Sequence, residues 1–422
     1  MSINKVKQSP KTEPKFFYGY IVVVAALFIL LAANGTQVGF GVFFKPLLAE
    51  FGWTRAITSG AFSLNMIMQG LIGIVMGRLN DRLGPRIVLT VCGFFLGIGY
   101  LLTSQTGTVW QLYLFYGGVI GIGMSGTAVP LMSTVARWFV ARRGIMTGII
   151  MNGMGIGGLI APLVIYWLIR TYDWRMSFMI LGAFVFIAVV LLAQFLRRDP
   201  AQMGQMAYGE NERGEQGLQL AAKGFSLGQA FSTRQFWVTV GMFFCLAFSI
   251  QVMLVHIAPH ATDLGISAAT AAGILATLGG VSIVGRIAMG IIADRIGNMR
   301  VFTICFAVMA AALFWLASAT EVWVIYLCTA IFGLTCPGAV ALTSPIVAEL
   351  FGLKSHGLIL GVTMFGFTLG AAVGPFLAGY IFDVTSSYEP TFLVCAAISI
   401  VGLVLAAILR PTTDERDKVE AI

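Results

Sequence analysis

The sequence has 422 residues, of which 58% are hydrophobic and only 10% are charged. A soluble globular domain has about a quarter charged residues, so this composition excludes an ordinary soluble protein and predicts a membrane protein. The net charge of +8 does not indicate nucleic-acid binding, because the basic residues lie in short segments between apolar runs. The six cysteines form no CxxC pair, so we expect buried thiols, no metal site and no cofactor.

Runs without Asp, Glu, Lys or Arg predict the membrane spans, because about 20 apolar residues cross a ~30 Å hydrocarbon core. The run 87–136 is long enough for two spans, with a polar break at 104–107. The stretch 264–293 is predicted to be one span that carries Arg286. In chain order the predicted runs are 16–44, 56–77, 87–136, 144–169, 176–196, 235–262, 264–293, 301–320, 322–348, 355–382 and 390–409.

These runs give twelve helices in two groups of six, which predicts an all-α integral membrane protein built from two six-helix bundles. Most of the 26 Lys and Arg residues fall on one side of the membrane if the amino terminus is cytoplasmic. The positive-inside rule therefore predicts two cytoplasmic termini and a multi-pass protein of the cell (inner) membrane. The predicted parts are a tail 1–15, a first bundle 16–196, a cytoplasmic linker 197–234, a second bundle 235–410 and a tail 411–422.

A motif after the second span recurs after the eighth. Residues 77–86 read GRLNDRLGPR and residues 290–300 read GIIADRIGNMR, with 213 residues between the leading glycines. This duplication resembles the major facilitator superfamily, whose loop motif is G-x-L-x-D-R/K-x-G-R/K-R/K. The resemblance implies two pseudo-symmetric bundles and motif residues that latch the cytoplasmic side when the carrier opens outward; the alternative is that the charges only stop translocation. The gating candidates are Gly77, Asp81, Arg82, Gly84, Arg86, Asp294 and Arg295.

Arg286 is the strongest candidate for chemistry, because ionisable residues within a span are costly and usually functional. It lies eight residues before Asp294, or ~12 Å inward from the membrane boundary at 1.5 Å per residue. Arginine offers a planar fork of donors that suits a carboxylate. With no Asp or Glu deep in another span, Arg286 is predicted to bind a substrate anion; the alternative is a structural role against backbone carbonyls.

Span 8 also resembles the monocarboxylate transporter family and its bacterial relatives. The resemblance rests on Gly285-Arg286 with Gly290 and Asp294, and on the segments 18–20, 138–144 and 263–267. In that family the span 8 arginine binds the substrate carboxylate, a role that Arg286 would inherit. Animal members have an acidic residue where this chain has Ser282, which places their proton relay in doubt. The related oxalate/formate exchangers add a lysine in span 11, where this chain has Phe365, so a single cavity cation favours a monoanion.

Further candidates come from the spans that line the central cavity of the superfamily. Each polar one has the alternative role of an interhelical hydrogen bond. Besides Arg286, the substrate-binding candidates are Ser282, Phe365, Asn34, Ser125, Thr127 and Asn152, with Gln37 nearby. For proton coupling we consider Asp263, placed at the outer end of span 8, and His256, with His260 close to it. The alternative for these three is a solvated loop.

The leading hypothesis is a secondary carrier of a small organic anion, a monocarboxylate such as lactate or pyruvate, coupled to protons. Its partners would be that anion, a proton and the lipid bilayer, with no nucleic acid, and the chain would act as a monomer. A second hypothesis keeps the fold but makes the protein an exporter of an aromatic acid, a siderophore or a drug. A membrane sensor or an intramembrane enzyme is disfavoured, because the sequence shows no metal cluster and no Ser–His pair at shared depth.

Overall fold

The computed structural model describes residues 17–53, 55–209 and 224–409, and these residues are mostly helical. The first six spans, called the N half, contain α1 (Gly19–Val38), α2 (Phe40–Phe51), α3 (Arg55–Leu83), α4 (Pro85–Ser104), α5 (Val109–Leu112), the π-helix η1 (Tyr113–Ile120), α6 (Gly121–Ser125), α7 (Ala128–Trp138), α8 (Arg143–Thr171) and α9 (Trp174–Ala193). The linker contains the 3₁₀ helix η2 (Pro200–Met203) and α11 (Leu227–Phe231). The last six spans, called the C half, contain α12 (Arg234–Asp263), α13 (Ala268–Ile296), α14 (Asn298–Ala317), α15 (Val322–Ala341), α16 (Thr343–Phe351), α17 (His356–Thr385) and α18 (Glu389–Ile408).

Twelve helical segments are long and apolar enough to cross a membrane, which confirms the predicted number of spans. The predicted break in the run 87–136 is also confirmed, since α4 ends at Ser104 and α5 begins at Val109. The fold is thus set by the need to satisfy every backbone group inside the bilayer, which a helix does within its own segment. All six cysteines are free and buried, as expected for thiols that act as small apolar groups.

One boundary in the C half differs from the prediction. Asp263 was placed at the outer end of span 8 but is the last residue of α12, which is span 7. Gly265 follows with a φ of 80°, a left-handed conformation that ends a helix. Ser267 then caps the next helix, its hydroxyl accepting a hydrogen bond from the Thr270 backbone N–H. Turn chemistry therefore moves Asp263 to the preceding span.

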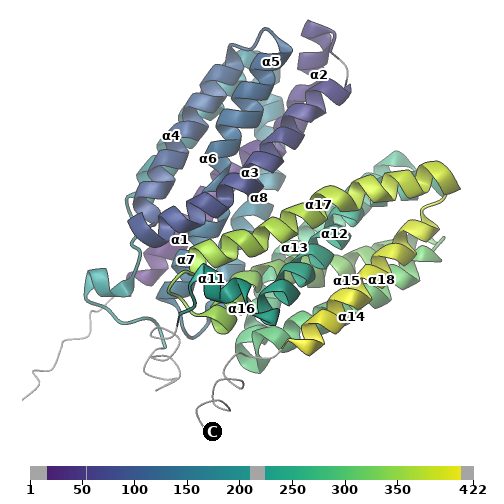
Figure 1. Cartoon of the computed structure of the whole chain (residues 1–422). Coiled ribbons are helices and arrows are strands. Elements are labelled where there is room, and N and C mark those ends of the chain that lie inside the picture. Colours follow the sequence, from purple (N-terminus) through teal and green to yellow (C-terminus); the bar gives the residue numbers. More distant parts are fainter. Residues whose placement is uncertain (1–16, 54, 210–223, 410–422) are drawn as a thin grey trace, which may run out of the picture.

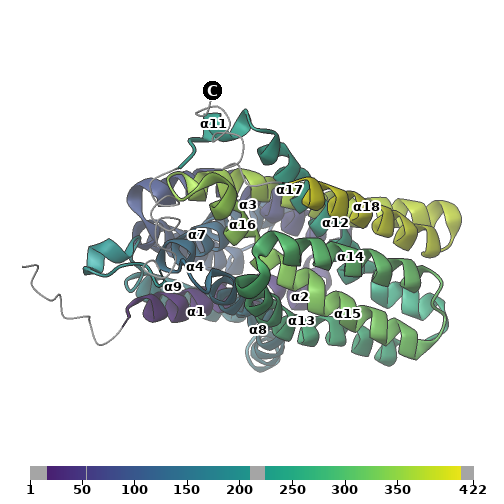
Figure 2. The same ribbon diagram turned by 90° about the horizontal axis from the view of Figure 1, so that it is seen from below.

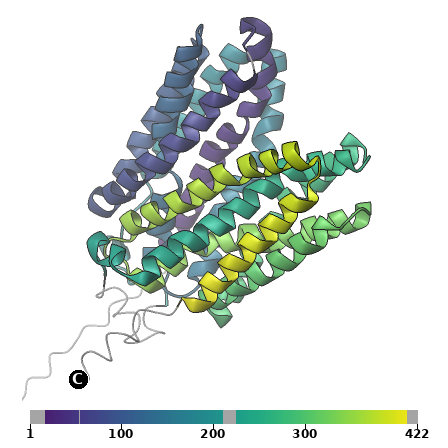
Figure 3. The same ribbon diagram turned by 45° about the vertical axis from the view of Figure 1, so that its right-hand side comes forward.

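The two halves converge at one end and diverge toward the other. Figure 1 shows the purple and blue helices of the N half leaning away from the green and yellow helices of the C half, and Figure 3 shows the same divergence after a turn of 45°. The end where α7 and α16 lie is called the converging end. The halves contact each other there along two seams, α3 against α17 and α8 against α13. Figure 2 shows these two pairs at opposite edges of the interface.

Paired glycines bring the helix backbones together at both seams. A Cβ at Gly77 would lie 2.2 Å from the carbonyl oxygen of Gly357, and a Cβ at Gly290 would lie 2.6 Å from that of Gly144. The offset of 213 residues relates Gly77 to Gly290 and Gly144 to Gly357, so the two seams are equivalent copies. Small residues at such crossings permit close backbone packing, which drives helix association in membranes.

Glycine packing inside the C half gives a testable stability prediction. A Cβ at Gly370 on α17 would lie 2.2 Å from the Phe244 carbonyl oxygen on α12. Backbone cannot rotate away, so Gly370→Ala is expected to destabilise the fold by about 1–3 kcal/mol. Thermal unfolding in detergent measures the change. Gly379→Ala is the matched control on the same helix, because nothing lies within 4 Å of its Cβ position; an equal effect of both variants would contradict the packing argument.

Candidate functional site

Arg286 lies on α13 with its side chain partly buried. Its Nη1 donates a hydrogen bond to Ser282 Oγ at 3.2 Å, one turn earlier on the same helix. The Ser282 hydroxyl in turn donates to the Gly279 carbonyl oxygen at 2.7 Å. In the part of the chain that the structure describes, no carboxylate forms an ion pair with Arg286. A guanidinium has five N–H donors, so this arrangement leaves capacity to bind an anion.

The guanidinium of Arg286 reaches across the seam toward α8 of the N half. A Cβ at Gly155 would lie 2.7 Å from Arg286 Nη1, so only glycine leaves room for the side chain as it lies here. Asn152 is one turn earlier on α8, and its Nδ2 donates to the Ile283 carbonyl oxygen of α13 at 3.1 Å. Of the predicted site residues, Arg286, Ser282 and Asn152 are therefore brought together at the seam between α8 and α13.

A second group of amides lies within the N half. Asn65 Oδ1 accepts hydrogen bonds from Gln37 Nε2 at 2.9 Å and from Gln69 Nε2 at 2.7 Å, and Asn65 Nδ2 donates to the Tyr116 carbonyl oxygen at 2.8 Å. The sequence analysis did not single out Asn65 or Gln69, because span 2 was not among the expected cavity-lining spans. Two amide side chains one turn apart in an otherwise apolar span are the signal that could have found them.

The other substrate-binding candidates lie apart from this amide group. The hydroxyls of Ser125 and Thr127 donate to the carbonyl oxygens of Ile122 at 2.6 Å and Met124 at 2.8 Å, at the junction of α6 and α7. Phe365 lies on the second seam, where its ring would be 3.4 Å from a Cβ at Gly70 of α3. Asn34 is buried on α1, and its Nδ2 has no hydrogen-bond partner among the described residues.

The histidines considered for proton coupling are buried in α12, so the alternative of a solvated loop is wrong for them. His256 Nε2 lies 3.1 Å from the Pro375 carbonyl oxygen and Nδ1 lies 3.2 Å from the Tyr388 hydroxyl. A carbonyl only accepts, so Nε2 must carry a proton and a neutral His256 would accept at Nδ1 from Tyr388. Burial, together with the nearby carboxylates Asp263 and Asp383, raises the pKa of Tyr388 above its ordinary value. These groups form a polar cluster between α12, α17 and the start of α18.

Two carboxylates join the halves at the converging end. Asp81, near the end of α3, accepts backbone N–H bonds from Gly357 at 3.1 Å and Leu358 at 2.9 Å at the start of α17. Asp294, near the end of α13, accepts from Gly144 at 2.9 Å and Ile145 at 3.0 Å at the start of α8. Each carboxylate thus sits at the positive end of a helix in the opposite half, where negative charge is favourable. We call these contacts the two latches.

The remaining gating candidates surround the latches without joining the halves directly. Arg86 Nε donates to Gln194 Oε1 at 2.8 Å within the N half, and Gly84 has a φ of 82° that lets the chain turn between α3 and α4. Arg82 and Arg295 are exposed. The sequence analysis missed Arg137, which pairs with Asp81 at 3.0 Å and also donates to the Leu353 carbonyl oxygen across the halves at 2.8 Å.

His356, the third histidine, was also missed by the sequence analysis. It is fully buried at the start of α17, where Nδ1 lies 3.1 Å from Ser133 Oγ of the N half and Nε2 lies 3.1 Å from the Ser344 carbonyl oxygen. Ser344 Oγ donates to the Met132 carbonyl oxygen at 3.2 Å, which adds another bond between the halves. A histidine placed directly after a short loop gave no sign of this pairing in the sequence.

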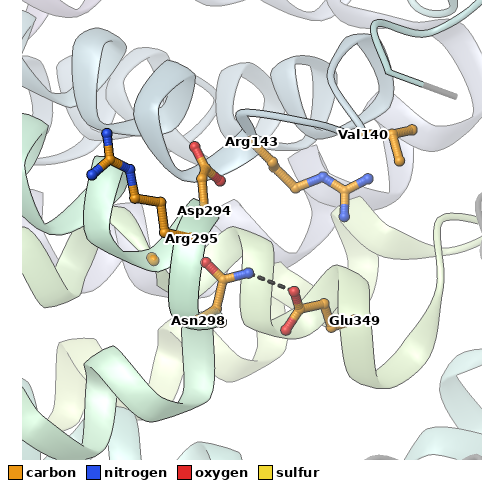
Figure 4. Close-up of a pocket in the computed structure, with 8 residues that line it drawn as sticks. Val140, Arg143, Asp294, Arg295, Asn298 and Glu349 are labelled. Carbon is orange, nitrogen blue, oxygen red and sulfur yellow. Dashed lines mark hydrogen bonds between the residues drawn. The ribbon is translucent and has the colours of Figure 1, made fainter. Parts of the chain in front are cut away.

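A cavity of about 130 Å³ lies beside the Asp294 latch. Figure 4 shows Asp294 and Arg295 on α13 facing Arg143 from the start of α8, with Asn298 hydrogen-bonded to Glu349 below them. Asp294 is eight residues from Arg286, or ~12 Å along the helix, so this cavity belongs to the latch and not to the Arg286 site. Within the described residues, no group of three or more His, Cys, Asp or Glu is placed to hold a metal ion.

Comparison with known proteins agrees with this architecture. The Major Facilitator Superfamily model matches residues 23–299 and 261–421. The chain is 27% identical to monocarboxylate transporter 13 of Rattus norvegicus over 93% of this chain and 89% of the relative, and 24% identical to monocarboxylate transporter 12 of Mus musculus over 94% and 87%.

Among solved structures, the proton:xylose symporter XylE superposes with a TM-score of 0.72 at 15% identity, covering 94% of this chain and 96% of that one. This likeness shows the shared fold. With a family match that spans nearly the whole sequence, twelve spans and a duplicated motif that forms two equivalent latches, the chain belongs to the Major Facilitator Superfamily.

Proposed function

We propose that this protein is a secondary active carrier of a small monocarboxylate such as lactate or pyruvate, and that Arg286 binds the carboxylate. The observation that carries the proposal is a partly buried guanidinium within a membrane span, with no ion-paired carboxylate in the described residues. An uncompensated cation at that depth is costly, and a bidentate organic anion would satisfy it. The relatives named monocarboxylate transporters support the same substrate class.

Alternating access would follow from the two latches. The converging end carries the basic segments around Arg86, Arg137 and Arg143, so we propose that it faces the cytoplasm of a cell (inner) membrane. In that orientation the structure is closed to the cytoplasm. Breaking both latches while the diverging ends approach each other would expose Arg286 to the opposite side. We propose that the chain does this as a monomer.

We propose further that the anion travels with a proton. Asp263 and His256 are the candidate carriers of that proton, and His256 is already linked to α17 through the Pro375 carbonyl oxygen. A shift of the His256 proton would change a contact between α12 and α17, both of which belong to the C half.

Uptake of labelled lactate into vesicles containing the purified protein tests the proposal. An acidic outside is expected to stimulate uptake, and unlabelled monocarboxylates are expected to compete. Competition by hydrophobic cations, with no effect of the acids, would instead favour a drug exporter on the same fold. A panel of unlabelled acids run at several pH values reports the substrate class and the coupling in one experiment.

The close approach of Arg286 to α8 gives a separate prediction. Gly155→Ala is expected to raise the KM for the transported acid about tenfold, because the new Cβ occupies the space beside Arg286 Nη1. The fold is expected to survive, since the group that must move is the end of a flexible side chain. Gly158→Ala on the same helix is the control, with its nearest neighbour at an ordinary 3.8 Å. An unchanged KM in Gly155→Ala would contradict the assignment of this seam as the anion site.

A further inference from the structure

The duplication shows where the Arg286 seam departs from its copy. A Cβ at Gly148 would lie 2.4 Å from the Arg286 carbonyl oxygen, and a Cβ at Gly361 would lie 3.2 Å from the Gly73 carbonyl oxygen. The offset of 213 residues relates both glycines and both partners, so the backbones of the two seams match. Packing alone would therefore be satisfied by the same kinds of residue on both sides.

Two polar residues on one seam correspond to apolar or missing side chains on the other. Arg286 corresponds to Gly73, and Asn152 corresponds to Phe365. Since the equivalent crossing packs without them, Arg286 and Asn152 are not required by helix packing. Their shared seam indicates a polar task that involves both residues.

The amide of Asn152 is held in one orientation. Its side chain is 4% exposed, and its Nδ2 donates to the Ile283 carbonyl oxygen at 3.1 Å. A carbonyl oxygen can only accept, so the amide nitrogen must face Ile283 and the Oδ1 atom is the one left over. That Oδ1 is buried and has no hydrogen-bond partner among the described residues. Buried acceptors are almost always paired, so this one is expected to gain a partner in another state of the protein.

The unpaired oxygen lies close to the guanidinium. Ile283, to which Asn152 is bonded, precedes Arg286 by three residues on α13, and Gly155, which abuts Arg286 Nη1, follows Asn152 by three residues on α8. Three residues of a helix rise ~4.5 Å. A carboxylate bound by Arg286 therefore places its second carbon within reach of Asn152 Oδ1.

We propose that Asn152 accepts a hydrogen bond from a hydroxyl on carbon 2 of the substrate, so that the site selects 2-hydroxy monocarboxylates. The inference rests on the proposed function, because Arg286 must hold the carboxylate for Asn152 to meet the next carbon. A 2-oxo acid presents an acceptor to an acceptor, and an unsubstituted acid leaves Oδ1 unpaired. A site built to bond a hydroxyl rejects analogues that lack it more strongly than an apolar pocket does.

The test compares uptake of labelled lactate, pyruvate and propionate by vesicles containing the full-length protein. The wild type is expected to show a KM for lactate about tenfold below those for pyruvate and propionate, a ratio that corresponds to ~1.4 kcal/mol. In Asn152→Ala and in Asn152→Leu, which retains much of the side-chain volume, the ratio is expected to fall to about one. Thr329→Val is the control, because it removes a different buried hydroxyl that also lacks a partner among the described residues; it is expected to keep the tenfold ratio.

The outcomes separate the two proposals. Arg286-dependent uptake of all three acids with equal KM in the wild type would overturn the hydroxyl inference and leave the proposed function standing. A lactate preference that survives both Asn152 variants would also overturn it. If both variants lose all uptake, ligand-induced thermal stabilisation of the purified wild type decides, since equal stabilisation by the three acids overturns the inference and a lactate preference supports it. Absence of Arg286-dependent uptake of any acid would remove the proposed function and this inference together.

Discussion

Arg286→Ala is expected to remove carboxylate uptake, with at least a 30-fold loss of apparent affinity in whatever transport remains. Truncating one member of a buried, hydrogen-bonded charge pair typically costs ~2–5 kcal/mol, and the other member here would be the substrate. Arg286→Lys is expected to recover part of the affinity, because lysine keeps the charge but lacks the planar fork that matches a carboxylate. Labelled lactate uptake into vesicles measures both variants.

Stability distinguishes a substrate role from a structural one for Arg286. In the described residues its side chain makes one hydrogen bond, to Ser282, and no ion pair. Desolvating a guanidinium for so little return is unfavourable, so Arg286→Ala is expected to unfold at the same temperature as the wild type or above it. A structural residue would show the reverse. Arg170→Ala, at the last turn of α8, is the control for removing an arginine from a span; full lactate uptake in Arg286→Ala would end the anion-carrier proposal.

Asp81→Asn and Asp294→Asn are each expected to shift the protein away from the conformation described here. Each carboxylate accepts two backbone N–H bonds from the opposite half, and hydrogen bonds to charged groups contribute ~1.5–3 kcal/mol. An asparagine keeps one acceptor oxygen but loses the charge at the helix N-terminus. A loss of ~2 kcal/mol would change the ratio of the two conformations about 30-fold. Because both latches close the same end, the double variant is expected to shift further than either single one.

Spin labels on opposite halves can measure this shift. Leu163 on α8 and Phe376 on α17 are 69% and 78% exposed, and both lie away from the converging end. The distance between the labels is expected to shorten in each latch variant as the diverging ends approach. Asp173→Asn is the matched control, because Asp173 caps α9 by accepting from the Met176 N–H within the N half alone. Unchanged distances in both latch variants would show that the latches do not set the conformation.

The spans could be predicted from the sequence because lipid imposes one requirement on every residue of a span. The break at Ser104, the count of twelve and the duplication all followed from where charges are absent and where a motif returns. Asp263 was misplaced because the end of α12 depends on the left-handed Gly265, and a charge-free run does not reveal a turn. The π-helix at Tyr113–Ile120 was likewise invisible, since its residues are as apolar as those of an α-helix.

The site was predicted only in part, because most of its contacts join residues far apart in the chain. Arg286 stood out by its cost in the bilayer, and Ser282 by its spacing of one turn. The bond from Asn152 to Ile283 and the pairing of His356 with Ser133 depend on how the halves meet. The histidines of α12 were weighed as loop residues because the sequence does not show which face of a helix is covered by its neighbours.

Each latch ends on main-chain amides, and this has a consequence for how the protein tolerates substitution. The donors at positions 144, 145, 357 and 358 belong to the peptide backbone, so they are present whatever side chain stands there, except proline. A search for co-varying charges would find the aspartates and no partner for them. Drift at Ile145 or Leu358 could change size and polarity for long evolutionary times while the interlock between the halves stayed intact.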